Sequence, residues 1–238
     1  MNVIHTDRLS KHFGSLKAVD QVSISVRQGE IMGLLGANGA GKTTLIKMLC
    51  GMLPPTEGTG TVAGYDIAGQ SASIRHHIGY MNQSVSLLEN LRVSENIEFY
   101  GKLYGMNQRE IAARWEELEA LFKMGAHRHK LASELSSGWR QMLAFVIAVF
   151  HNPKTLFLDE PTSGLDPLSR FEMWEQIYRT AYQGTTIIMS THYLSEAWYC
   201  DRLIMMENGR VTAEGSPEHL NEISGKQGLG QLFLMHSG

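Results

Sequence analysis

The sequence contains little of what zinc-binding, disulfide-stabilised and membrane-spanning proteins need. Its only cysteines, Cys50 and Cys200, lie far apart, so neither a zinc site nor a disulfide framework is expected. Two isolated cysteines fit a reducing compartment. The longest apolar run extends only from Met142 to Phe150, whereas a helix that spans a bilayer needs about twenty such residues. We therefore expect no membrane-spanning segment, and any role at a membrane would need a partner.

The chain also lacks a large excess of positive or negative charge. Lysine and arginine number 21 and aspartate and glutamate 24, which gives a net charge of −3 and a pI near 6.4. Such a chain offers no broad basic field for nucleic-acid phosphates, so we expect no direct nucleic-acid partner. The first residues also lack the basic and apolar regions of a secretory signal. With 238 residues, 43% of them hydrophobic, the chain can form one large core or two lobes.

Three short apolar runs predict buried parallel strands. They span residues 31–35, 155–158 and 185–189, and each ends in glycine-rich or polar sequence. Residues 168–182 predict the helix that crosses between the last two strands. Helical patterning from about 87 to 150 predicts a helical lobe, and Asn208-Gly209 predicts the turn of a hairpin. The fold class is therefore α/β, with the chemistry expected at the carboxyl ends of the strands.

The glycine-rich segment after the first run predicts a phosphate site. Residues 36–43 match the P-loop pattern G-x-x-x-x-G-K-[ST] at every fixed position, between a predicted strand and a predicted helix. Glycines let backbone N–H groups turn toward phosphate oxygens, and the helix N-terminus adds its positive dipole end. We expect Lys42 to bridge the β- and γ-phosphates of ATP and Thr43 to bind Mg²⁺. The contacts expected from this segment are Gly36, Asn38, Gly39, Ala40, Gly41, Lys42, Thr43 and Thr44.

Two acidic residues follow the second apolar run, where a P-loop enzyme places its metal-side acid. Neighbouring side chains at a strand end point in different directions. Asp159 is therefore expected to hold Mg²⁺ through water, and Glu160 to polarise the water that attacks the γ-phosphate. An Asp-Glu-Pro sequence alone would indicate only a solvated loop, but a P-loop in the same chain favours the catalytic interpretation.

Further motifs, in a fixed order along the chain, resemble those of ABC ATPases. Residues 135–141 resemble the family's signature motif, although Ser137 and Trp139 replace its usual glycine and glutamine. Gln83 resembles the residue of the Q-loop. Asp166 resembles that of the D-loop, and His192 the switch histidine.

The resemblance covers nearly the whole chain and implies a fold. Phe13 is placed like the family's aromatic residue that stacks on adenine. The implied fold is a P-loop NTPase with a RecA-like core, an antiparallel β subdomain and an inserted α-helical signature subdomain. The catalytic lobe would comprise residues 1–86 and 151–220, the helical lobe 87–150, and a C-terminal tail 221–238.

The resemblance also implies partners. Two ATPase subunits, identical or different, would pair head to tail, so that Ser136 and Gly138 of one cap the ATP held by the other and Asp166 links the two sites. His192 would contact the γ-phosphate, and Gln83 would reach the Mg²⁺ and the water. An integral-membrane permease would be the further partner, which would place the chain in the cytoplasm, peripheral to the inner face of the cell membrane.

Segments 51–58, 63–66 and 91–96 resemble ATPase subunits of ABC-2-type exporters, which favours export of a drug or another hydrophobic cargo. Two alternatives stay open. A soluble ABC ATPase acting on ribosomes or nucleic acid usually joins two ATPase domains or carries a long coiled coil. A non-catalytic nucleotide-binding regulator would be favoured by loss of Glu160 or His192, and both are present.

Overall fold

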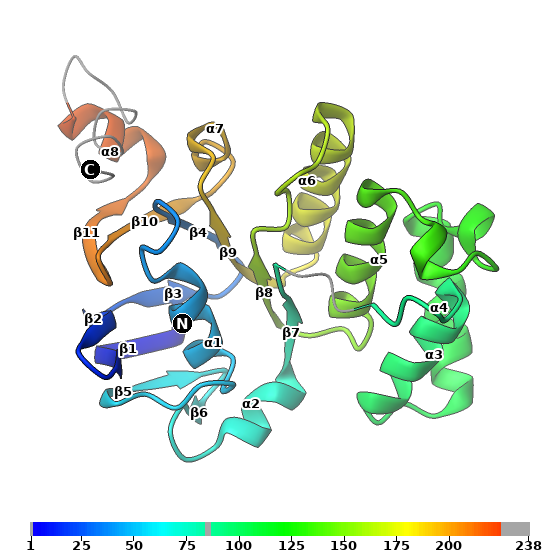
Figure 1. The fold of residues 1–238 in the computed structure, drawn as a ribbon, viewed down its shortest axis with the longest axis horizontal. Helices are drawn as coiled ribbons and strands as arrows, with labels where there is room; N and C mark the ends of the chain where they lie inside the picture. Colours follow the sequence, from blue (N-terminus) through cyan, green and yellow to red (C-terminus); the bar gives the residue numbers. More distant parts are fainter. Residues whose placement is uncertain (1, 84–86, 225–238) are drawn as a thin grey trace.

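A mostly parallel sheet lies at the centre of the protein. The computed structural model describes residues 2–83 and 87–224. The parallel strands are β4 (Ile31–Leu35), β7 (Ile78–Met81), β8 (Thr155–Asp159), β9 (Thr186–Thr191) and β10 (Arg202–Glu207). They lie in the order β10, β4, β9, β8, β7, and β11 (Arg210–Gly215) is antiparallel at the β10 edge. The three strands predicted from apolar runs are therefore neighbours in the middle of the sheet (Figure 1).

Burial on both faces explains why these strands are continuous apolar runs. Alternate residues of β4 enter different cores: Ile31 and Leu35 belong to one, and Met32 and Leu34 belong to the other. Helices α5 (Ser137–Val149) and α6 (Pro167–Tyr182) contribute to the first core, and α1 (Lys42–Leu49) contributes to the second. Because both faces of the sheet are packed, the parallel strands are held firmly and their carboxyl ends lie along the same edge of the sheet.

An antiparallel sheet lies on the side of α1 and confirms the expected β subdomain. β1 (Asn2–Phe13) pairs with β2 (Leu16–Val22), β3 (Ser25–Arg27) and β5 (Glu57–Val62), and β5 pairs with β6 (Tyr65–Asp66). Helix α2 (Ser71–His77) then leads to β7. The loop at the start of α1 and the β1–β2 hairpin thus come close together (Figure 1).

The region predicted to be helical contains α3 (Val93–Leu103), α4 (Gln108–Leu121) and α5. The Asn107 side chain caps α4 by accepting the backbone N–H groups of Arg109 and Glu110. Short 3₁₀ helices at Gly125–His127 and Ala132–Glu134 connect α4 to α5. Because α5 also packs on β7 and α6, it joins the helical region to the sheet. The division of the chain at residues 87, 150 and 221 stays a prediction.

Helix α6 and the last hairpin agree with their predictions. Asp166 caps α6, and Asn208 and Gly209 both have positive φ (48° and 79°), as a type I′ turn requires. Helix α7 (Leu194–Ala197) follows β9, and α8 (Pro217–Ile223) follows β11. The apolar residues 232–235 lie outside the described part of the chain. Every described helix is too short or too polar to cross a bilayer.

His151 is a partly buried histidine just after α5. Its ring stacks on that of Tyr104, with centroids 3.8 Å apart. Its Nε2 donates to the carbonyl oxygen of Ile78 at 3.0 Å, because a carbonyl can only accept. Its Nδ1 is buried without a hydrogen-bond partner among the described residues. Burial lowers the pKa of His151 from 6.5 to about 4, since an imidazolium would lose its hydration there.

We predict that the protein loses stability as the pH falls from about 6.5 toward 4. In this interval the unfolded chain binds a proton at His151 that the folded chain does not, so the free energy of unfolding falls by up to about 3 kcal/mol for this group. Replacement of His151 by Gln keeps a donor for Ile78 but removes the titration, and should reduce the loss. Urea unfolding at neutral and acidic pH measures it; an equal loss in both proteins would contradict this assignment.

Candidate functional site

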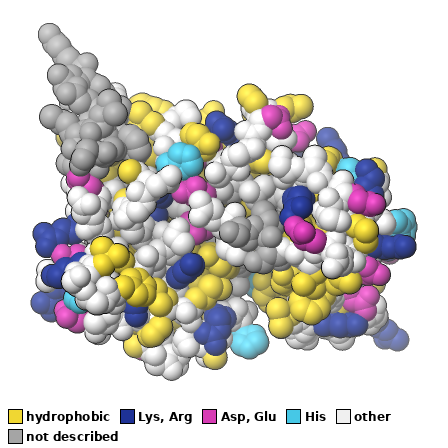
Figure 2. All heavy atoms as spheres, in the orientation of Figure 1, with side chains coloured by type: hydrophobic (Ala, Val, Ile, Leu, Met, Phe, Trp, Pro, Cys, Tyr) yellow, Lys and Arg dark blue, Asp and Glu magenta, His cyan; other side chains and the backbone are white. Residues whose placement is uncertain are grey.

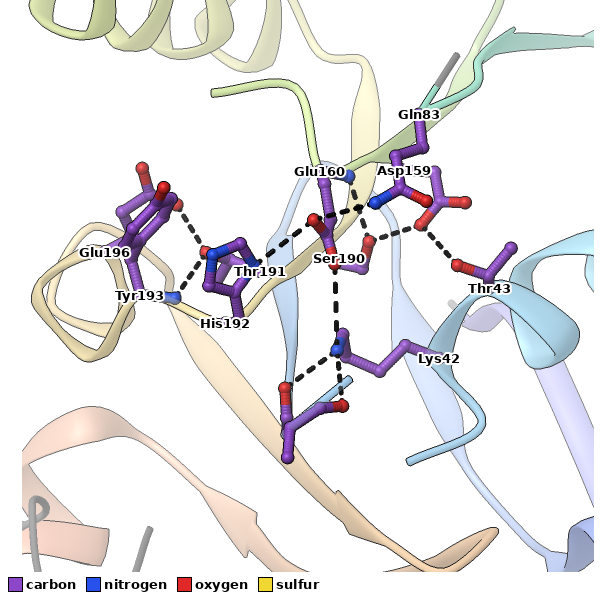
Figure 3. A network of polar contacts seen from close by, with 12 residues as sticks. Lys42, Thr43, Gln83, Asp159, Glu160, Ser190, Thr191, His192, Tyr193 and Glu196 are labelled. Carbon is purple, nitrogen blue, oxygen red and sulfur yellow. Dashed lines mark hydrogen bonds and ion pairs between the residues drawn. The ribbon is translucent and has the colours of Figure 1, made fainter. Parts of the chain in front are cut away.

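Three loops meet where the parallel strands end. β4 leads into the glycine-rich residues 36–41, β8 into Glu160, and β9 into His192. Because the three strands are parallel neighbours, their loops leave from the same edge of the sheet. Figure 3 shows the side chains of Lys42, Glu160 and His192 converging at this edge.

The glycine-rich loop wraps around the ammonium group of Lys42. Its Nζ donates to the carbonyl oxygens of Gly36 (2.7 Å) and Ala37 (2.9 Å). Gly41 caps α1 with a φ of 103°, and a Cβ there would lie 2.4 Å from the carbonyl oxygen of Ala18, so only glycine fits. Burial lowers the pKa of Lys42 against the opposing effect of two nearby carboxylates. A helix N-terminus and a buried ammonium group thus face the same space, which suits an anion.

Asp159 is the best candidate for a metal ligand. Its Oδ1 accepts hydrogen bonds from the hydroxyl groups of Thr43 (3.0 Å) and Ser190 (2.6 Å). Its Oδ2 is buried with no hydrogen-bond partner among the described residues. A buried carboxylate oxygen beside a threonine hydroxyl fits Mg²⁺, which prefers oxygen ligands. The described residues contain no group of three or more acidic, cysteine or histidine side chains placed to hold a metal ion, so phosphate oxygens and water would have to complete the coordination.

Glu160 is where the catalytic candidates meet. Its side chain is only 6% exposed. Its Oε2 accepts a hydrogen bond from Nε2 of Gln83 at 3.1 Å and lies 3.2 Å from Nδ1 of His192. Its Oε1 lies 3.9 Å from Nζ of Lys42. The backbone of Glu160 is in the left-handed region, with a φ of 52°, and its N–H donates to Oγ of Ser190. The carboxylate therefore has neighbours from three separate parts of the chain, and Ser190 holds the backbone of the same residue.

A cavity of about 490 Å³ opens in front of these groups. It extends from Glu160 and Gln83 over the glycine-rich loop to Phe13, whose ring is half exposed. An accessible ring face suits stacking on a nucleobase. Gly36 does not line the cavity, but its carbonyl group binds Lys42. The other expected P-loop contacts all line it, namely Asn38, Gly39, Ala40, Gly41, Lys42, Thr43 and Thr44.

Three residues predicted for the site lie elsewhere in the subunit. Ser136 and Gly138 are at the start of α5 and Asp166 is at the start of α6, and none of them lines the cavity. Ser136 is exposed, and its Oγ accepts the N–H of Trp139 at 3.5 Å. Hydrogen bonds from Ser169 lower the pKa of Asp166. The structure therefore brings Lys42, Asp159 and Glu160 together and leaves the segment of Ser136 at the surface.

Ser190 and part of the cavity wall were not predicted from the sequence. The only signal for Ser190 is a polar residue near the end of an apolar strand, two positions before His192. The hairpin turn was predicted as a turn only, because the sequence does not show that the N–H of Gly209 donates to the carbonyl oxygen of Ala40. The cavity residues that were missed are Leu16, Lys17, Ala18, Asn208 and Gly209.

Comparisons with known proteins show which family and which solved structures the chain is similar to. The family model described as ABC transporter matches residues 19–163. The probable multidrug ABC transporter ATP-binding protein YbhF of Escherichia coli (strain K12) is 43% identical over 92% of this chain, which spans only 38% of that relative. The daunorubicin resistance ATP-binding protein DrrA3 of Streptomyces coeruleorubidus is 37% identical over 93% of this chain and 71% of its own length. The solved structure of an ATP-binding subunit of an ABC transporter has a TM-score of 0.87 at 28% identity, over 98% of both chains.

We predict that replacement of Ser190 by Ala lowers the free energy of unfolding by about 1–3 kcal/mol. The change leaves the N–H of Glu160 and one oxygen of Asp159 without their buried partner, and such unpaired groups carry a desolvation cost of this size. Urea denaturation measures the effect. Ser195, an exposed serine after the same strand, is the matched control, and its replacement by Ala should change stability by no more than about 0.5 kcal/mol. Equal effects of the two substitutions would contradict the role of Ser190.

Proposed function

The chain belongs to the ABC transporter family, and from this we propose that it binds and hydrolyses ATP to drive export through a membrane permease. The observation that carries the proposal is the convergence of Lys42, Asp159 and Glu160 beside one cavity. Lys42 and Glu160 line it, and Asp159 lies directly behind it, where it accepts a hydrogen bond from the lining residue Thr43. This convergence of a cation, a metal-side acid and a candidate base is what hydrolysis of a terminal phosphate needs.

Each side chain has a defined task in the proposed reaction. Lys42 exchanges the carbonyl oxygens of its own loop for β- and γ-phosphate oxygens of ATP, which releases Glu160 from the 3.9 Å contact with its ammonium group. Glu160 then orients the attacking water and accepts its proton. Gln83 and His192, both beside Oε2 of Glu160, hold this carboxylate and the water in line with the γ-phosphate.

Mg²⁺ fits beside Asp159 and Thr43, as the unpartnered Oδ2 of Asp159 indicates. When bound there it would neutralise charge on the phosphate oxygens. Ser190 keeps the Asp159 carboxylate in place through its 2.6 Å hydrogen bond to Oδ1, which leaves Oδ2 without a partner among the described residues.

Pairing of two ATPase subunits completes the site in this proposal. Within one subunit neither Ser136 nor Gly138 lines the cavity. A second subunit, placed head to tail, would bring the exposed N-terminus of its α5 to this cavity, with the Ser136 hydroxyl and backbone N–H groups as donors to phosphate. Asp166, ionised at the start of α6, would lie near the junction of the two subunits.

A permease would contact the chain at the groove beside α3. The groove has a volume of about 530 Å³ and is lined mainly by apolar and aromatic side chains, including Met52, Ile78, Leu103 and Tyr104. Figure 2 shows hydrophobic side chains gathered over this part of the surface, below and beside α3. Because no described helix can span a bilayer, a separate membrane protein would supply the pathway. Docking to it would hold the chain at the cytoplasmic face of the membrane.

Export is favoured by the names of the relatives, one a multidrug transporter subunit and the other a daunorubicin resistance protein. The two alternatives fit less well. A non-catalytic regulator would not need the arrangement of Glu160, Gln83 and His192 around one carboxylate. A nucleic-acid partner finds no broad basic surface in a chain with a net charge of −3.

We predict that replacement of Glu160 by Gln lowers the rate of ATP hydrolysis by 10²- to 10⁴-fold while ATP binding is kept. The amide cannot accept the proton of the attacking water, and a general base contributes a factor of this size. Phosphate release gives the rate and calorimetry gives the affinity. Replacement of Glu172 by Gln, at an exposed position on α6, is the control and should leave both unchanged. Hydrolysis at the normal rate in the Glu160→Gln protein would refute the role of Glu160.

We predict that Ser136→Arg prevents ATP-dependent pairing of the Glu160→Gln protein. The long cation would occupy the surface that caps the partner's ATP, whereas the P-loop of the same subunit is untouched. Size-exclusion chromatography with and without ATP measures pairing. Ser133→Arg adds the same side chain at an exposed position three residues earlier and should leave pairing intact. A dimer that persists in the Ser136→Arg protein would rule out capping by this segment.

A further inference from the structure

Glu196 is a fully buried carboxylate next to the switch histidine. It lies on α7, and its Oε2 accepts a hydrogen bond from the hydroxyl group of Thr191 at 2.6 Å. The same hydroxyl oxygen accepts the N–H of Tyr193 at 3.0 Å. Thr191 and Tyr193 are the two neighbours of His192 in the chain, so the carboxylate fixes the backbone on both sides of that residue. Figure 3 shows this chain of contacts beside the imidazole ring.

Arg170 on α6 lies opposite this carboxylate. Its Nε forms an ion pair with Oε1 of Glu196 at 3.9 Å, and both atoms are buried without a hydrogen-bond partner among the described residues. Its guanidinium group lies over the ring of Tyr193, 4.4 Å from the centroid, and that ring packs on His192 at 4.2 Å. One arginine thus balances the charge of Glu196 and holds the aromatic ring next to His192.

The same arginine reaches the segment that precedes α6. A terminal nitrogen of Arg170 donates to the carbonyl oxygen of Leu165 at 3.4 Å, and Leu165 is followed by Asp166. Arg170 therefore contacts both the segment that carries His192 and the segment that carries Asp166. A buried carboxylate needs an opposite charge nearby, and Arg170 is the cation that contacts it. The ion pair between Arg170 and Glu196 therefore holds α6 and α7 against each other.

We propose that Arg170 and Glu196 are a pair of positioning residues that hold the imidazole of His192 beside Glu160 and tie it to the turn at Asp166. Neither side chain lines the nucleotide cavity, so the pair acts through His192 and not by contact with ATP. The proposal rests on the proposed function, in which His192 helps to orient the water. A contact made by a second subunit at Asp166 would then be transmitted to His192 through Arg170.

The first test observes His192 directly and needs no activity. Glu196→Gln keeps an acceptor for the Thr191 hydroxyl but removes the charge that faces Arg170. Ring signals of the 10 histidines are recorded by NMR on the full, nucleotide-free chain, and the signal lost in His192→Gln identifies His192. The ring signals of His192 should shift in Glu196→Gln while those of distant histidines stay in place. Unchanged His192 signals would overturn the proposal.

A second buried pair in the same chain provides the matched control. Glu30 is 8% exposed, and its carboxylate lies 2.9 Å from the guanidinium of Arg202, at the opposite end of the sheet from His192. Glu30→Gln removes the same charge from a similar environment. It should leave the His192 signals unchanged even where it lowers the melting temperature. If both substitutions moved these signals equally, the effect of Glu196 would be a general loss of stability and the proposal would be wrong.

Kinetics distinguish positioning from binding. In Glu196→Gln the kcat for ATP hydrolysis should fall on the order of 10- to 100-fold, because a small misplacement of a positioning group has effects of this size. The Kd for ATP should change less than about twofold, because the P-loop is intact. In a His192→Ala background the same substitution should cause no further loss, whereas an independent role would give an additional loss and contradict the proposal.

Arg170→Lys is the second variant in case Glu196→Gln folds poorly. Lysine keeps the buried charge balanced but lacks the planar group that lies over Tyr193 and reaches Leu165. It should shift the His192 signals and lower kcat with little change in melting temperature. A lower melting temperature alone, with normal signals and kcat, would overturn the proposal. If the wild-type chain did not hydrolyse ATP, the proposed function would fail, and the NMR result would still decide whether the pair positions His192.

Discussion

Two adjacent carboxylates buried at the end of β8 are the constraint on which the site depends. Asp159 and Glu160 cannot both be buried as anions without nearby cations and donors. Lys42, Thr43 and Ser190 supply them from α1 and β9. These partners can reach the end of β8 only if β4 and β9 lie where the sheet order places them, with α1 rising directly from β4. The charge requirement of the site and the topology of the sheet therefore specify the same arrangement.

The backbone at Glu160 shows how the two carboxylates are separated. A non-glycine residue in the left-handed region costs about 1–2 kcal/mol, and the φ of 52° at Glu160 turns the chain sharply after the strand. The Glu160 side chain consequently faces Lys42 and His192, while the Asp159 side chain faces Thr43. Ser190 offsets part of this cost by accepting the N–H of Glu160. One serine thus supports both Asp159 and Glu160.

Local signals in the sequence predicted much of this structure. The runs at 31–35, 155–158 and 185–189 gave strands within two residues of their observed ends, because strands buried on both faces are apolar throughout. The P-loop was predictable since all of its fixed residues lie in one segment. The long strand β1 was not predicted. Its bulges interrupt the alternation of apolar residues, and one of its partner strands, Glu57–Val62, lies far away in the sequence.

The contacts that escaped prediction depend on the pairing of strands that are distant in the sequence. Ser190 meets Asp159 only because β8 and β9 are in register at these two residues. Arg170 and Glu196 are separated by a strand and a helix terminus, and each alone would be interpreted as a solvated charge on a helix. Their burial becomes visible only when α6 and α7 are placed on the same side of the sheet. A charge pattern in one helix does not contain this information.

The surroundings of residues 137–139 explain the departures from the usual signature motif. A Cβ at Gly138 would lie 2.6 Å from Oγ of Ser169, whose hydroxyl donates to Asp166 at 2.6 Å. A side chain at 138 would therefore displace the Ser169 hydroxyl from its hydrogen bond to Asp166 at the start of α6. Ser137 replaces the other glycine at an exposed position where a side chain has room, and Trp139 is half-buried against the ring of His127 at 4.2 Å. The replaced residues lie where the structure tolerates or uses a side chain, and the retained glycine lies where it does not.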